Sequence, residues 1–177
     1  WEDQRYVETQ CDFAVFSFVK AMVKMHKQPK ILRYGKDQRL LQKFGCNYEV
    51  GLQFALHVGW AIEGATGSEH KIDVSFLGPH IEELKLLLTA TKQYGAHLLL
   101  SERFHFSCSS EMKTRFCRKV DRVHFVSHDF LTDIYTVDVN MNSVTPPADK
   151  SRKYPSGLLH ENDIDIKAFN IVDEASD

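Results

Sequence analysis

Apolar residues recur along this chain with two different spacings, and each spacing predicts a different kind of element. Between residues 10 and 28 they return every three to four positions, which is typical of a helix with one buried face. Asp12 is the expected N-cap of this helix, and Pro29 is expected to end it. A second, shorter helix is predicted around residues 37–44.

The clearest helical pattern covers residues 79–94. Pro79 suits a first helical turn, and Gly95 suits the position after the last. Glu82 and Glu83 complement the positive end of the helix dipole. The inward face is expected to consist of Ile81, Leu84, Leu87, Leu88 and Thr91.

Strict alternation of apolar and polar residues predicts a strand over residues 48–61. Its inward face would hold Val50, Leu52, Phe54, Leu56 and Val58. A second apolar run covers residues 71–78, and the segment between the two runs contains Gly64 and Gly67. Two strands joined by such a connection make a hairpin.

Further short strands are predicted at residues 97–100, 116–126 and 134–139, with a helical turn beginning at Ser101. This order of elements favours an α+β fold, in which helices cover one face of a sheet. We therefore expect one domain over residues 1–139 and a polar C-terminal extension over residues 140–177 that lies on the surface or on a partner.

Composition narrows the classes of function. The chain has 177 residues and a net charge of −2, so its overall charge does not favour nucleic acid or an anionic membrane. No apolar run is long enough to span a bilayer. Four cysteines without CxxC pairs favour a reduced, intracellular setting. His105 and Cys108 are the closest mixed pair, but they lack the spacing of a zinc site, so no metal is expected.

Three segments carry a resemblance to a known family. They read HVGWAIEGATGS from residue 57, KIDVSFLGPHIEELKLLLTATKQYGAHLLLSE from residue 71, and CRKVDRVHFVSHDFLTDIYTVDV from residue 117. In this order and at this spacing they resemble the homology domain of class III adenylate and guanylate cyclases, most closely divergent cyclase-like proteins of protists. The resemblance implies a ferredoxin-like α+β domain that works as a dimer, with nucleotide bound between two such domains.

The resemblance also implies a reaction, in which the ribose 3′-hydroxyl attacks the α-phosphate with the help of two metal ions. Active members use an Asn and an Arg on the helix after the hairpin and a Lys-Gly pair, often with a further phosphate-binding Lys, before the last strand. The matching positions here are Glu82, Leu86, Val126, Ser127 and His128, which offer the wrong chemistry. Ser75 stands where the family has purine-selecting residues. The strands that carry the two metal-binding Asp residues are expected to lie upstream of Trp1.

Three functions follow from these residues as alternatives. The first is a structural or regulatory pairing module without catalysis. The second is half of a heterodimeric cyclase whose partner supplies Asn, Arg and Lys. The third is a module that binds nucleotide without turnover. No cofactor is expected, except Mg or Mn with ATP or GTP for the enzyme half. The expected partner is another cyclase-like domain or a larger assembly, on the cytoplasmic side of the cell and within a parent protein of membranes or cilia.

Cyclase domains meet through the central hairpin and the adjoining helix. The corresponding candidates for a dimer interface are His57, Trp60, Phe76, Pro79 and Leu86. Exposed apolar side chains on such a surface would mark an interaction site. The alternative is that Trp60 and Phe76 belong to the core.

Overall fold

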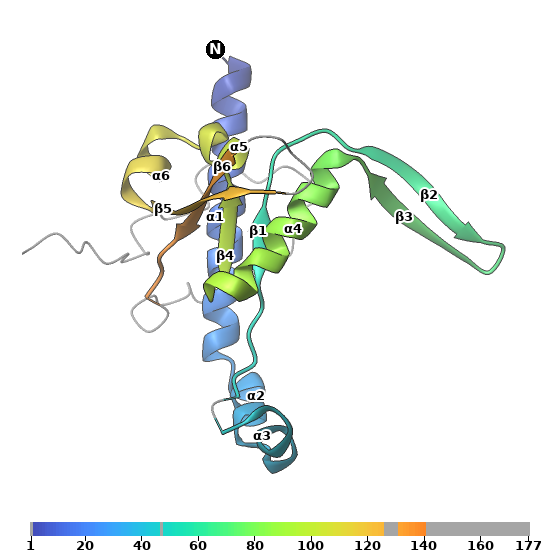
Figure 1. The fold of residues 1–177 in the computed structure, drawn as a ribbon, viewed down its shortest axis with the longest axis vertical. Helices are drawn as coiled ribbons and strands as arrows, with labels where there is room; N and C mark the ends of the chain where they lie inside the picture. The colour runs from blue at the N-terminus through green and yellow to red at the C-terminus, as the bar shows by residue number, and fades with distance from the viewer. Residues whose placement is uncertain (1, 47, 126–130, 141–177) are drawn as a thin grey trace, which may run out of the picture. The chain divides into compact units, whose positions relative to one another are not determined.

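The computed structural model describes residues 2–46, 48–125 and 131–140 (Figure 1). The chain divides into two units. The first comprises Trp1–Phe16 and Leu52–Asp138, and the second comprises Ser17–Gly51 and Val139–Asp177. Almost all of the predicted extension over residues 140–177 lies outside the described residues.

Helix α1 runs over Glu2–Lys27 and belongs in part to each unit. It begins well before Asp12, so the prediction that Asp12 caps the helix is wrong. The Asp12 carboxylate instead accepts a hydrogen bond from the backbone N–H of Ser109, at 3.1 Å. The predicted stop is confirmed, because α1 ends at Lys27 and Pro29 begins the next helix.

The second unit continues with short helices. They are α2 (Pro29–Leu32), the 3₁₀ helix η1 (Arg33–Lys36) and α3 (Gln38–Phe44). Helix α3 was predicted, and Asp37 caps it by accepting a hydrogen bond from the N–H of Arg39 at 3.0 Å.

The first unit holds a four-stranded mixed sheet in the order β1-β4-β6-β5. Its strands are β1 (Phe54–Leu56), β4 (Leu98–Ser101), β5 (Cys117–His124) and β6 (Leu131–Val137). Strand β1 pairs in parallel with β4, whereas β4 with β6 and β5 with β6 are antiparallel. The predicted α+β class is confirmed, and the arrangement is compatible with a ferredoxin-like fold.

Strand β1 is much shorter than the strand predicted over residues 48–61. Only Phe54, Ala55 and Leu56 find partners, because β4 offers a short row of residues to pair with. The flanking apolar residues of the predicted inward face are exposed instead. These are Val50, Leu52 and Val58.

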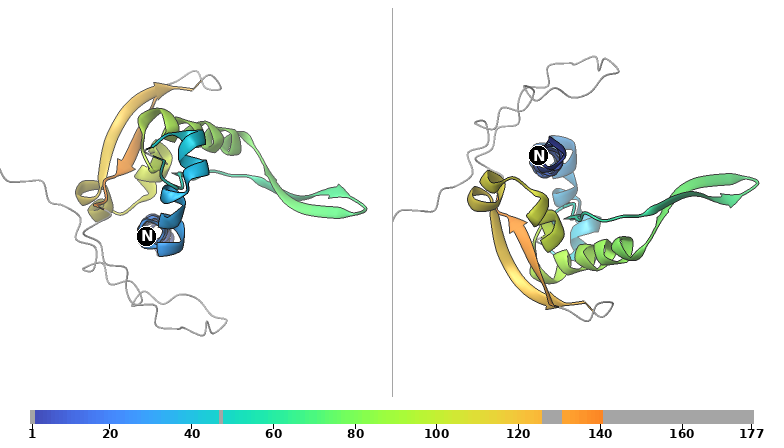
Figure 2. Two further views of the ribbon diagram at one scale, coloured as in Figure 1. Left: turned by 90° about the horizontal axis from the view of Figure 1, so that it is seen from below. Right: turned by 90° about the horizontal axis from the view of Figure 1, so that it is seen from above.

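The predicted hairpin exists, but it is shifted along the chain. It is built from β2 (Ile62–Ser68) and β3 (Lys71–Leu77), which form a separate two-stranded sheet. The glycine-bearing segment predicted as a connection is therefore the first strand itself. Figure 2 shows the hairpin from two further sides as a long twisted ribbon that leads into helix α4 (Pro79–Tyr94).

Helix α4 covers one face of the sheet and begins and ends where predicted, with Gly95 in the left-handed conformation after the last turn. The prediction that Leu88 faces inward is wrong, because Leu88 is exposed. Glu83, predicted as a dipole partner, is buried. The core beneath the helix is formed by Leu87, Ala90, Leu99 and Ile134, against which Ala55, Ala96, Val120, Val123 and Phe125 pack.

Two short helices, α5 (Glu102–Ser107) and α6 (Ser110–Arg115), link β4 to β5. Each is capped by the serine before it, because the hydroxyl of Ser101 accepts from the N–H of Phe104 and that of Ser109 from Met112. Within the described ranges, no helix combines the length and apolar character needed to cross a membrane.

Candidate functional site

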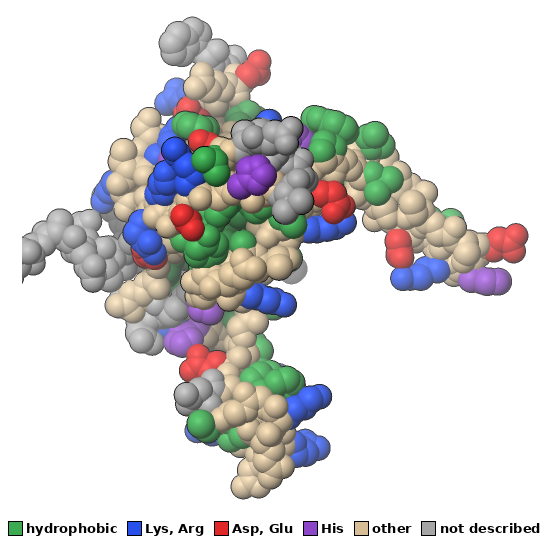
Figure 3. All heavy atoms as spheres, in the orientation of Figure 1, with side chains coloured by type: hydrophobic (Ala, Val, Ile, Leu, Met, Phe, Trp, Pro, Cys, Tyr) green, Lys and Arg blue, Asp and Glu red, His purple; other side chains and the backbone are tan. Residues whose placement is uncertain are grey.

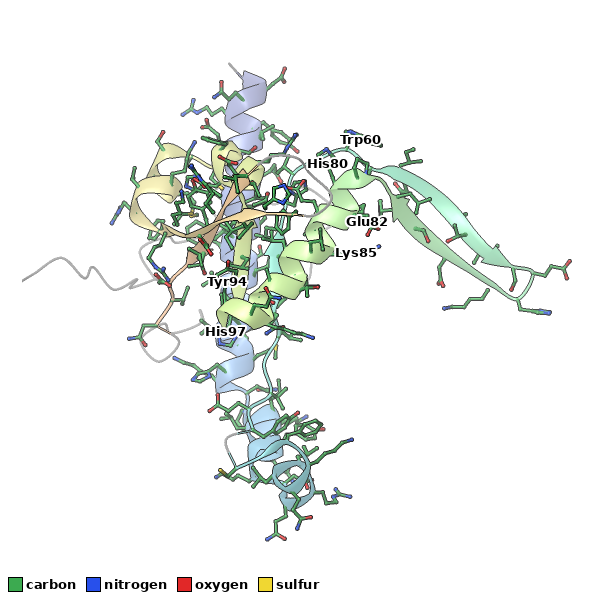
Figure 4. All side chains as sticks on the ribbon, in the orientation of Figure 1. Trp60, His80, Glu82, Lys85, Tyr94 and His97 are labelled. Carbon is green, nitrogen blue, oxygen red and sulfur yellow. The ribbon has the colours of Figure 1, made fainter. Side chains whose placement is uncertain are left out.

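The end of β1, the base of the hairpin and the first turns of α4 meet in one region of the first unit. His57 follows β1, Trp60 precedes β2, and His80 and Glu82 lie in the first turn of α4 (Figure 4). Lys85 lies in the next turn. Most residues predicted as functional fall in this region.

His57 is the centre of a polar network in this region. Its Nδ1 lies 2.8 Å from the hydroxyl of Ser101, and its Nε2 lies 2.9 Å from Nδ1 of His80. The carboxylate of Glu83 lies beside both rings, with Oε1 3.6 Å from His57 Nδ1 and Oε2 3.7 Å from His80 Nδ1. The network thus joins the end of β1 to α4 and to β4.

Gly59 makes room for this network. A Cβ added there would lie 2.6 Å from His80 Nδ1 and closer still to other ring atoms, so any side chain would overlap the imidazole. The edge of Trp60 meets the His80 ring on another side, at 6.1 Å between centroids. Gly78 has φ of 152°, a conformation that other residues rarely adopt, and it lies under Trp60. The His57-x-Gly59 motif therefore has a packing role here.

The structure buries the interface candidate His57, whose side chain is only 3% exposed. The imidazole faces Ser101 and His80, so it cannot itself present a contact surface to a partner. Trp60, Phe76 and Pro79 are exposed. Within this chain, the alternative that Trp60 and Phe76 belong to the core is therefore wrong.

Two of the positions that match the catalytic residues of cyclases lie on the outer face of α4. The Glu82 carboxylate is exposed and forms an ion pair with Lys85 at 2.7 Å. Leu86 is 38% exposed, one turn further along. Val126, Ser127 and His128 lie outside the described residues.

The two faces of the hairpin differ in chemistry. On one face, Ser75 stands opposite Gly64, its hydroxyl shares a hydrogen bond with Thr66, and Lys71 pairs with Asp73 at 2.8 Å. The hydroxyl predicted to face a purine is thus already engaged within the hairpin.

The other face of the hairpin is apolar and exposed. Strand β3 contributes Ile72, Val74 and Phe76, which are 73%, 62% and 52% exposed. They stand opposite Gly67, Ala65 and Glu63 on β2. Figure 3 shows hydrophobic side chains at the base of the hairpin and charged ones at its tip. We call Ile72, Val74 and Phe76 the apolar hairpin face.

The roles of His80 and Glu83 were not predicted from the sequence. The two lie three residues apart, which places them on the same side of a helix, and this was a signal that the sequence carried. His57 is distant in the sequence, so only the fold brings it to them. The pair His105 and Cys108 does not form a site: the Cys108 thiol donates to the carbonyl of Phe104 at 3.3 Å.

Other titratable groups of the first unit serve the structure. Asp133 pairs with Arg122 and Lys119, each at 2.6 Å, and hydrogen bonds from these two cations hold its pKa well below the usual range. His105 stacks on Tyr135 at 3.7 Å, and burial lowers its pKa. Burial also raises the pKa of Cys117 to about 11, which makes it a poor nucleophile.

Comparison with known proteins gives a partial match. No family model and no curated protein matches the chain. Two solved structures of a bacterial light-regulated adenylyl cyclase are similar to 45% of this chain, with 22% and 25% sequence identity and a TM-score of 0.36. The match spans 22% of each cyclase chain, so the activity of those proteins is not carried over to this one.

Proposed function

We propose that this chain is a catalytically degenerate class III nucleotidyl cyclase homology domain that acts as a pairing module. It binds a second cyclase-like domain, in the simplest case a second copy of itself, through the apolar hairpin face and the exposed residues at the hairpin base. The proposal rests on the three sequence segments that resemble the family and on the surface chemistry of the hairpin and α4.

The chemistry of α4 supports the absence of catalysis. Where a cyclase needs an amide and a guanidinium to orient ribose and stabilise charge on the α-phosphate, this helix presents the carboxylate of Glu82 and the apolar side chain of Leu86. Loss of one such donor costs about 2.7–4 kcal/mol of transition-state stabilisation, or roughly 10²–10³ in rate. Glu82 would also repel a polyphosphate, and both side chains face solvent.

The apolar hairpin face is the observation that carries the pairing role. An isolated two-stranded hairpin is marginally stable in water, and three or more strands or a packed face are needed for independent stability. Every residue of β2 and nearly every residue of β3 is exposed in the single chain. A second copy would cover Ile72, Val74 and Phe76 with the same apolar face, which is how a two-fold interface is built.

Measurement of mass in solution tests the pairing. We expect the purified chain to sediment as a concentration-dependent dimer, and Val74→Asp to sediment as a monomer with an unchanged circular dichroism spectrum. Ser68→Asp is the matched control, because it places the same charge on the opposite face of the hairpin, across from Lys71. A wild-type monomer at all concentrations, or equal dimerisation of both variants, would contradict the proposal.

A cyclase assay tests the loss of catalysis separately. We expect the chain alone to form neither cyclic AMP from ATP nor cyclic GMP from GTP with magnesium or manganese. The missing donors at Glu82 and Leu86 are the physical reason. Robust turnover by the purified chain would show that the domain is a working cyclase.

A further inference from the structure

The strongest unassigned feature of the chain is the cluster of His57, His80 and Glu83. Histidine, cysteine, aspartate and glutamate side chains can bind a metal ion. Across the part of the chain that the structure describes, this is the only group of three or more of them whose donor atoms all lie within 4.8 Å of one another. Its members come from the end of β1 and from the first two turns of α4, so the fold alone assembles it. Figure 4 marks the place by the label of His80.

The distances in the cluster are close to those between side chains that bind one metal ion. Donor atoms bound to one tetrahedral zinc ion at about 2.0–2.1 Å lie roughly 3.3–3.5 Å apart. His57 Nε2 and His80 Nδ1 are 2.9 Å apart, and His80 Nδ1 is 3.7 Å from Glu83 Oε2. One donor atom of each of the three residues lies within 4.8 Å of the other two, so side-chain movements would bring them to one ion.

A second layer of contacts holds His57 in the orientation that a metal ligand needs. Its other nitrogen, Nδ1, lies 2.8 Å from Ser101 Oγ and 3.6 Å from Glu83 Oε1. A metal-bound imidazole usually donates its remaining N–H to an oxygen, which fixes the tautomer and the ring. Here Ser101 Oγ is placed to accept that proton, so Nε2 keeps its lone pair for the ion.

The three side chains of the cluster are largely buried. Those of His57, His80 and Glu83 are 3%, 14% and 9% exposed. A metal ion bound at the cluster would place a positive charge beside the Glu83 carboxylate, which is a partner that buried carboxylates take. His80 is the most exposed of the three, and its ring lies against Gly59 and the edge of Trp60.

We propose that His57 Nε2, His80 Nδ1 and Glu83 form a site for a divalent transition-metal ion, with zinc as the best match. Two imidazoles and one carboxylate, with a fourth position open to water, are a donor set that zinc takes in proteins. Magnesium and calcium prefer all-oxygen sites, which separates this site from one for a nucleotide-bound magnesium ion. The bound ion ties the base of the hairpin to α4 and β1.

Zinc titration of the chelator-stripped chain tests the site. We expect the wild type to bind one zinc ion in isothermal titration calorimetry, and His80→Gln and Glu83→Gln each to lower the affinity at least tenfold. His97→Gln is the matched control, because His97 is an exposed histidine beyond the other end of α4 and should bind as the wild type does (Figure 4). Cobalt in place of zinc should give the intense visible bands of four-coordinate geometry in the wild type.

Three results would overturn the proposal. They are no zinc binding by the wild type, equal binding by His80→Gln and His97→Gln, or cobalt spectra that are the same in both variants. Glu83→Gln keeps the shape of the side chain, so it separates loss of a ligand from loss of fold. Zinc should raise the melting temperature of the wild type and of His97→Gln but not of Glu83→Gln. None of these outcomes depends on the proposed pairing.

Discussion

Gly59→Ala is the substitution that most directly tests the geometry of the site. The new methyl group would lie 2.6 Å from His80 Nδ1, whereas ordinary van der Waals contact begins at 3.4 Å, so the ring must move by at least 0.8 Å. The ring is held between Trp60 and His57, so the movement also disturbs the 2.9 Å hydrogen bond between the two histidines.

The expected cost of Gly59→Ala follows from these two effects. Overpacking a filled site costs about 1–3 kcal/mol. Loss of a partly buried hydrogen bond adds about 0.5–1.5 kcal/mol. Alanine in place of glycine raises the free energy of unfolding by about 0.4–1 kcal/mol, because it lowers the conformational entropy of the unfolded chain. We therefore expect the free energy of unfolding to fall by about 0.5–4 kcal/mol in urea titrations with a metal chelator present.

The matched control is Gly64→Ala on β2. A Cβ there meets nothing within 4 Å, and neither glycine has a positive φ, so the unfolded-state effect is the same without the overlap. In a His80→Ala background, Gly59→Ala should lose both unfavourable effects, which gives a coupling energy of about 1.5–4.5 kcal/mol between the two positions. If Gly59→Ala destabilises no more than Gly64→Ala, or the coupling is zero, the packing of His80 on Gly59 is wrong.

Two further predictions concern α4 and α5. The double variant Glu82→Asn with Leu86→Arg should change the free energy of unfolding by at most about 1 kcal/mol, because both side chains face solvent and the ion pair with Lys85 is a surface contact. A loss beyond about 2 kcal/mol in a urea titration would place Leu86 in a core. Burial lowers the pKa of His105, so the unfolded chain takes up a proton there first, and stability falls as the pH drops below about 6.5. His105→Phe keeps a ring on Tyr135 and should reduce that fall; equal pH profiles for wild type and His105→Phe would contradict this.

The sequence was sufficient for elements whose ends are set by local chemistry. Helix α4 begins at Pro79 and ends at Tyr94, before Gly95, as predicted, and α3 lies where a short helix was predicted, because prolines, glycines and local apolar spacing act on their own neighbours. Strand lengths were less predictable. The alternation over residues 48–61 continues past both ends of β1, but a strand extends only as far as its partner, and β4 is short. The start of α1 was missed because the residues before Asp12 carry no apolar stripe.

Parts of the candidate site likewise depend on residues that are neighbours in the sequence, and other parts depend on contacts that only the fold makes. Of the apolar hairpin face, only the apolar run over residues 71–78 and the candidate Phe76 were predicted, and the structure adds that Ile72, Val74 and Phe76 are all exposed. The histidine cluster was not visible, because it depends on a parallel pairing of β1 with β4 that carries His57 to Ser101 and α4. Close contacts join the histidine cluster to the base of the hairpin. Gly59 and Trp60 both lie against His80, and Gly78 lies against Trp60. A residue that fixes His80 therefore also fixes the base of the hairpin.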